Sequence, residues 1–222
     1  MFNEKSIAET AFHQDFSPIL LGHTKLAILH GYMLAGKCVD DNDFLKAFVG
    51  KRNRSQLENT AVEFAIKNRA ERFGLEITVE DSDNSRGTFP HYKFSVGKAI
   101  FTVSRTQVYD ALPREAGFRS INSGLNSQME MINKDGYFAL PENFSEVDRY
   151  YGILTFGGRA SVDFMHLGIP NSDIDRWLYQ CNIASAISPV EKQVAASELI
   201  QEGVVAAVKD EFIKRQEVSG SE

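Results

Sequence analysis

The stretch HYKFSVGKAIFTVSR, residues 91–105, decides the fold, because two alternating strands flank a short turn there. Glycine at the first of the two central positions, 97 and 98, is typical of a type II′ hairpin turn. That turn places six apolar side chains on one face: Tyr92, Phe94, Val96, Ala99, Phe101 and Val103. The other face carries a polar strip, defined as His91, Lys93, Ser95, Thr102 and Ser104, flanked by Lys98 and Arg105. The sequence therefore predicts a hairpin whose polar strip points away from the core.

The segments around the hairpin predict an α+β protein. Residues 75–80 alternate as a strand should, so one sheet unit spans about 75–105, and a second hairpin is predicted over 150–167. Helix-start signals, in which Ser precedes Pro or a Glu three residues later, occur at residues 6, 17, 55 and 188. A helix is also predicted over 173–183. We therefore expect an N-terminal helical unit, an antiparallel sheet built from two hairpins, and a long C-terminal helix over 189–216.

Length and composition predict a single domain. The 222 residues, 43% of them hydrophobic, suit one α+β domain over 1–217, with a weak division near 106–120 and a disordered tail at 218–222. The net charge of −6 argues against a dedicated non-specific binder of nucleic acid or membranes. Without a signal-peptide pattern or a convincing apolar span, we expect a cytoplasmic protein with no membrane partner.

Basic residues nevertheless gather in two segments of this acidic chain. Residues 51–72 and 91–134 each carry six Lys or Arg against three Asp or Glu. If the two segments adjoin, they form a local basic surface for an anionic ligand, with nucleic acid as one candidate. The residues expected to contact that ligand are Lys51, Arg52, Arg54, His91, Lys93, Lys98 and Arg105. The alternative is that the polar strip is simply the solvated face of a half-exposed sheet.

The order of elements over 1–105 resembles the layout of winged-helix DNA-binding domains. Several short helices, a longer helix over 55–73 and a following hairpin occur in the order that such a layout requires. The resemblance implies a hairpin that acts as a wing beside the helices. The alternative is that helix 55–73 is an ordinary amphipathic packing helix, since Glu63 and Lys67 form the pair that a solvated face carries.

A Mg²⁺-dependent nuclease is the enzyme hypothesis that the sequence leaves open. Four residues resemble the restriction-endonuclease type of site: Glu63 on a helix, Glu80 and Asp81 at a strand end, and Lys93 on the next strand. There, carboxylates hold the metal and a Lys stabilises charge on the phosphate. His91 stands where that pattern has an acid, so one metal ligand is missing. No other catalytic or metal motif occurs, so no cofactor is expected outside this hypothesis.

The predicted C-terminal helix raises a partner hypothesis. Its apolar stripe runs through Val190, Val194, Ile200, Val204, Val208 and Phe212. Most such stripes pack within their own chain, which is the favoured interpretation. The alternative is that helix 189–216 mediates a homodimer or binds a protein partner, as in an acidic regulator or inhibitor.

Overall fold

The computed structural model describes residues 6–47, 50–82, 90–134, 149–159, 161–187 and 207–213. The helices are α1 (Ile7–Asp15), α2 (Pro18–Asp40), α3 (Asp43–Lys46), α4 (Arg54–Phe73), α5 (Gly117–Ser123) and α6 (Ser127–Lys134), with 3₁₀ turns η1 (Gly50–Asn53), η2 (Gly124–Asn126) and η4 (Ile183–Ser185). The strands are β1 (Thr78–Ser82), β2 (His91–Val96), β3 (Ala99–Arg105), β4 (Tyr150–Gly157), β5 (Phe164–Pro170) and β6 (Trp177–Asn182). Residues 207–213 are also helical. The α+β class is therefore confirmed.

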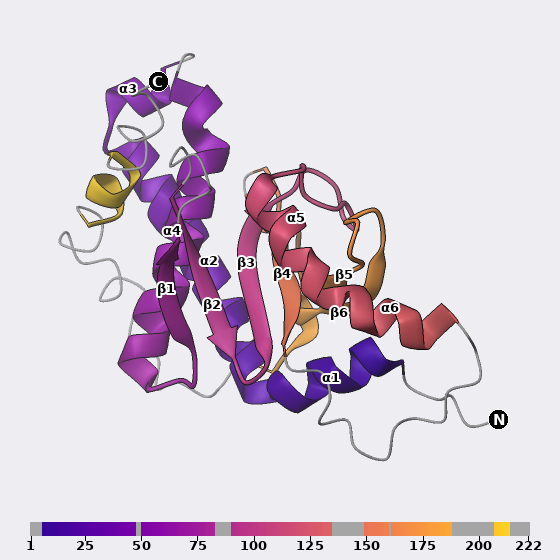
Figure 1. Cartoon of the computed structure of the whole chain (residues 1–222). Helices are drawn as coiled ribbons and strands as arrows, with labels where there is room; N and C mark the ends of the chain where they lie inside the picture. The colour runs from indigo at the N-terminus through magenta and orange to yellow at the C-terminus, as the bar shows by residue number, and fades with distance from the viewer. Residues whose placement is uncertain are drawn as a thin grey trace.

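A six-stranded mixed sheet forms the centre of the molecule, and its strands lie side by side in chain order from β1 to β6 (Figure 1). Neighbouring strands are antiparallel, except that β3 and β4 are parallel. An antiparallel sheet of two hairpins was therefore too simple a prediction. Parallel neighbours need a long crossover, and α5, η2 and α6 lie in the segment that connects β3 to β4.

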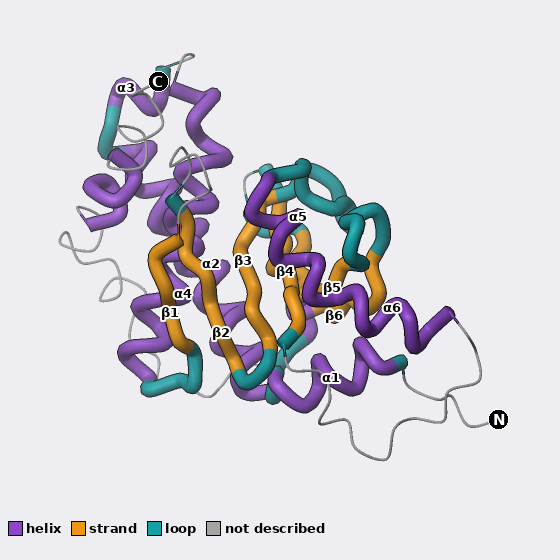
Figure 2. Tube along the Cα trace, in the orientation of Figure 1, coloured by secondary structure: helices purple, strands orange, loops and turns teal. Residues whose placement is uncertain are grey.

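Helices cover both faces of the sheet (Figure 2). α2 and α4 pack together on one face, and α5 and α6 lie on the other. The main core lies under α2 and α4, where Val62 and Ile66 join Phe94 and Phe101 in one buried cluster. The apolar face of the hairpin thus points into this core. β2 and β3 are interior strands, between β1 and β4, so the expected wing-like hairpin does not occur.

Local signals correctly placed several helix ends and the hairpin turn. Ser6 and Ser17 accept hydrogen bonds from the backbone N–H groups of Glu9 and Leu20, so both predicted N-caps are confirmed. Gly74 ends α4 with a left-handed φ of 59°, as predicted. Gly97 has a φ of 53°, and Lys98 has no positive φ, as a type II′ turn requires.

Two helix predictions need comment. The helix predicted over 173–183 is wrong, because Trp177–Asn182 is strand β6, with Cys181 opposite Leu167 of β5. A short, partly apolar run of residues is compatible with both a helix and a strand. Here the segment pairs with the free edge of β5 and therefore forms a strand. Of the expected helix 189–216, only 207–213 is described. There Val208 and Phe212 are buried in a second cluster against α2 and α4, so this part packs within its own chain.

Among the described segments, none of the helices has the length and apolar character needed to cross a membrane.

Candidate functional site

Arg54 and Arg105, which the sequence placed in separate basic segments, meet at one carboxylate. Arg54 is the first residue of α4 and Arg105 is the last residue of β3. The Nε atom of Arg54 lies 2.9 Å from Oε1 of Glu58, and the Nε atom of Arg105 forms a close ion pair with Oε2. Glu58 is only 2% exposed, so both guanidinium groups are held in place by a buried anion.

The turn after β4 completes this corner of the molecule. The carbonyl of Gly158 accepts hydrogen bonds from Nη2 of Arg105 at 2.6 Å and from the hydroxyl of Tyr32 at 2.8 Å. The carbonyl of Arg159 accepts one from Nη2 of Arg54 at 3.3 Å. The side chain of Arg159 is exposed. These bonds tie the turn to α2, α4 and β3.

We call Arg52, Arg54, Arg105 and Arg159 the arginine corner. Arg52 is exposed in η1, two residues before Arg54. The first turn of α4 has no acid, and Asn53 makes no side-chain cap. The positive end of the helix macrodipole therefore adds to the arginine charges at this point.

Glu58 was assigned to a capping box with Ser55, and that assignment is wrong. The helix has already begun at Arg54, so Ser55 is inside its first turn. The carboxylate instead turns toward the sheet. Burial disfavours the charge of Arg105, but Glu58 and Tyr32 outweigh it and raise the pKa of the Arg105 guanidinium. Arg105 therefore stays cationic over the whole working range of pH.

Beside the corner, β2 and β3 separate from each other (Figure 1). We call the polar contacts between the separated parts of the two strands the polar seam. Their ladder pairs only residues 94–96 with 99–101, although both strands continue further. Side chains of α4 bind the backbone beyond the ladder. Glu63 accepts hydrogen bonds from Nδ2 of Asn59 at 2.9 Å and from the N–H of Tyr92 at 3.4 Å. Oδ1 of Asn59 accepts one from the N–H of Arg105 at 3.1 Å.

The other face of this seam is covered by α5. The ring of His91 stacks on Phe118 at 4.0 Å, and Arg119 donates to Oγ of Ser104 at 3.2 Å. Burial lowers the pKa of Arg119 below its usual value. Thr102 is fully buried and bonds the hydroxyl of Tyr151 at 2.5 Å. Much of the polar strip is thus covered rather than solvated, because the crossover helix packs on it.

Lys98 and Lys93, two other predicted contact residues, do not join the arginine corner. Lys98 is at the hairpin turn, where its N–H donates to Oδ2 of Asp15. Seven strand residues at ~3.3 Å each separate it from Arg105 by roughly 23 Å, which exceeds two Debye lengths of about 10 Å at 0.1 M salt. Lys93 is opposite Glu80 on the sheet face away from α4. Lys51 precedes Arg52 in η1.

The residues of the nuclease hypothesis are also divided between the two faces. Glu63 reaches β2 from α4, and Asp81 is opposite Tyr92 on that side of the sheet. Glu80 and Lys93 face the other way. Within the part of the chain that the structure describes, no three His, Cys, Asp or Glu side chains are grouped closely enough to hold a metal ion. No contact therefore favours this hypothesis over the arginine corner.

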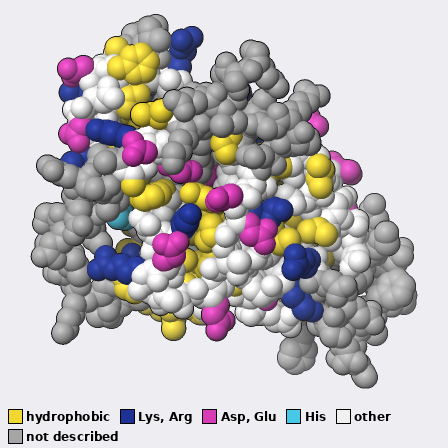
Figure 3. Space-filling model, turned by 60° about the vertical axis from the view of Figure 1, so that its left-hand side comes forward, with side chains coloured by type: hydrophobic (Ala, Val, Ile, Leu, Met, Phe, Trp, Pro, Cys, Tyr) yellow, Lys and Arg dark blue, Asp and Glu magenta, His cyan; other side chains and the backbone are white. Residues whose placement is uncertain are grey.

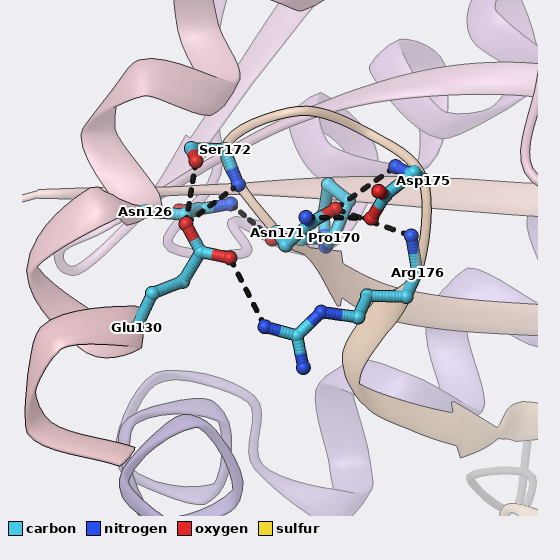
Figure 4. Close-up of polar contacts among 7 residues, drawn as sticks. All are labelled: Asn126, Glu130, Pro170, Asn171, Ser172, Asp175 and Arg176. Carbon is cyan, nitrogen blue, oxygen red and sulfur yellow. Dashed lines mark hydrogen bonds and ion pairs between the residues drawn. The ribbon is translucent and has the colours of Figure 1, made fainter. Parts of the chain in front are cut away.

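A separate polar cluster fastens the loop after β5 to α6 (Figure 4). Glu130 accepts hydrogen bonds from the hydroxyl of Ser172 at 2.5 Å and from Nη2 of Arg176 at 3.3 Å. Oδ1 of Asn171 accepts two backbone N–H groups of the same loop. Asn126 joins β4 to β5 by donating to the carbonyls of Tyr151 and Pro170. These groups bond to one another, so the cluster acts as a structural clasp.

Comparison with protein-family models, curated proteins and solved structures found no match.

Sequence reasoning did not find two residues of the site. Arg159 belongs to no motif in the sequence, and Glu58 lies 47 positions from its partner Arg105. The sequence did carry a signal for the pair of Arg54 with Glu58, because an acid four residues after an Arg lies on the same face of a helix.

Proposed function

We propose that the protein is a binding module for an anionic ligand, and that the arginine corner is its contact surface. One observation carries the proposal: Arg54 and Arg105 are fixed side by side by Glu58 at the N-terminal end of α4. A guanidinium presents planar donors that match phosphate or carboxylate oxygens. Because the two groups are already held in place, binding costs little ordering of their side chains.

The first turn of α4 supports the same ligand chemistry. The positive end of a helix macrodipole favours phosphate and carboxylate groups. Arg52 and Arg159 extend the positive charge outward, since both side chains are exposed. An anion at this point would meet cations from α4, β3, η1 and the turn after β4.

The corner is local rather than part of a broad basic face. Basic and acidic side chains are interspersed on the surface in Figure 3. Glu58 cancels one charge of the corner, and the exposed Asp163 donates its N–H to the carbonyl of Gly157 in the adjoining turn. This charge pattern favours a ligand that places one or two anionic groups at the corner.

The test is calorimetric titration with pyrophosphate, at two salt concentrations. Arg54→Ala should lower the affinity about tenfold or more, because a charge-assisted hydrogen bond contributes roughly 1.5–3 kcal/mol. Arg159→Ala should also weaken binding. Lys98→Ala is the matched control, since it removes one cation at the far end of β3. Binding that Arg54→Ala leaves unchanged, or that Lys98→Ala weakens equally, would contradict the proposal.

A further inference from the structure

Tyr109 is an exposed aromatic ring that nothing in the core requires. It lies in the segment between β3 and α5 and is 48% exposed, and its neighbour Val108 is 65% exposed. The ring makes edge contacts with Phe164, at 5.9 Å between centroids, and with His166, at 4.4 Å. The ring is thus supported by the sheet, while about half of the residue remains exposed to solvent.

The segment that carries Tyr109 is itself fastened to the sheet. The N–H of Thr106 donates to the carbonyl of Phe156 at 2.9 Å, and the indole N–H of Trp177 donates to the carbonyl of Asp110 at 3.0 Å. Asp110 has a positive φ of 52°, which non-glycine residues rarely adopt. The ring therefore has a defined position before any ligand arrives.

Tyr109 and the arginine corner flank the same turn. Phe164, which supports the ring, is opposite Gly157 in the β4–β5 ladder. The next residue, Gly158, accepts the hydrogen bond from Arg105. Both features thus lie at the same edge of the sheet, at the carboxyl ends of β3 and β4, but on opposite faces. Phe164 and His166 belong to the face that α5 covers, whereas Arg105 points to the face that α4 covers. A ligand that contacts both features must therefore pass around the turn after β4.

We propose that the anionic ligand is a single-stranded nucleic acid, with phosphates at the arginine corner and one base stacked on Tyr109. This inference rests on the proposed function and names its ligand class. Proteins that bind single strands combine basic groups along the backbone with aromatic rings on which bases stack. A duplex is disfavoured, because its bases are already stacked on one another and cannot reach the ring.

Two acidic residues lie close to this edge of the sheet. Asp110 follows Tyr109, and Asp163 lies beside the turn. Each repels a phosphate backbone, so affinity should be moderate and should fall as salt is added. Asp163→Asn removes one of these charges without touching the ring or the arginines. It should raise the affinity for a single strand severalfold.

The experiment is fluorescence anisotropy with labelled twelve-residue strands of dT and rU, an abasic strand of equal length, and a duplex. The abasic strand keeps the phosphates and removes the bases. The unmodified protein should bind dT or rU about fivefold or more tighter than the abasic strand, the lower end of what one stacked base contributes. Tyr109→Leu should remove that difference, whereas Tyr109→Phe should keep it.

The outcomes separate this inference from the function on which it rests. Arg54→Ala should weaken the dT, rU and abasic strands alike. Tighter binding of the dT strand, the rU strand or both than of the abasic strand supports the inference. Equal affinity for dT, rU and abasic strands, or tighter binding of the duplex, overturns it. Pyrophosphate binding without measurable binding of any single strand also overturns it but leaves the anion site intact.

Discussion

Replacing Arg105 by Met should destabilise the protein far more than replacing Arg54 by Met. Both residues pair with Glu58, but the Arg105 side chain is 16% exposed and that of Arg54 is 47% exposed. Removing one partner of a buried ion pair costs up to about 3–5 kcal/mol, and in Arg105→Met the buried carboxylate of Glu58 keeps only its half-exposed partner, Arg54. An exposed pair contributes only about 0–1 kcal/mol.

Thermal unfolding followed by circular dichroism measures the difference directly. For a chain of this size, 1 kcal/mol shifts the melting temperature by roughly 2–4 °C, so Arg105→Met should lower the melting temperature by up to about 6–20 °C, and Arg54→Met by no more than about 4 °C. The double variant Glu58→Leu with Arg105→Met is the control. It leaves neither of these two charges unpaired in the interior, so it should be more stable than Arg105→Met alone.

Two results would refute this reasoning. Equal losses for Arg54→Met and Arg105→Met would mean that burial does not distinguish the two pairs. A double variant whose loss equals the sum of the Glu58→Leu and Arg105→Met losses would mean that the two groups act independently. The expected result also matters for the binding tests, because it identifies Arg54 as the arginine of this ion cluster that can be removed without unfolding the protein.

Three further predictions concern the clasp, a buried histidine and the hairpin turn. Hydrogen bonds from Ser172 hold the pKa of Glu130 below its ordinary value of 4.5. The stability that these hydrogen bonds supply is therefore lost as pH falls below that value. In a plot of the urea unfolding midpoint against pH, Glu130→Gln should flatten this region. Parallel plots for the variant and the unmodified protein would contradict this prediction. Burial lowers the pKa of His166 below 6.5, so the folded state disfavours protonation and stability should decline as pH falls below 6.5. His166→Phe should remove that slope, and an unchanged slope would assign it to another group. Gly97→Ala should lower the free energy of unfolding by at least about 1 kcal/mol, because φ is 53° and an added Cβ would lie 2.1 Å from Oδ1 of Asp15. The control is Gly36→Ala on α2, where an added Cβ meets no atom, and it should raise the free energy of unfolding by ~0.5–1 kcal/mol. Equal effects of the two variants in thermal melts would refute the argument from backbone strain.

Sequence patterns placed most elements because their signals are local. The caps at Ser6 and Ser17 and the stop at Gly74 each depend on atoms within a few residues. The hairpin register around Gly97 has the same origin, since a two-residue turn leaves few ways to pair the flanking strands. Beyond Phe94 and Phe101 the ladder ends, and side chains of α4 bind the backbone N–H groups of Tyr92 and Arg105 instead.

The sequence by itself determined the apolar face of the hairpin and the presence of two basic segments in an acidic chain. Only the tertiary structure decided which basic residues meet. The parallel pairing of β3 with β4 brings Arg105 next to the turn at Gly158, and the packing of α4 on β3 brings Arg54 to the same carboxylate. The physical reason is that an ion pair forms wherever two charges are close in space. Residues that form such a pair can be far apart in sequence, so no local motif or periodicity predicts them, whereas caps, turns and alternating strands are local patterns.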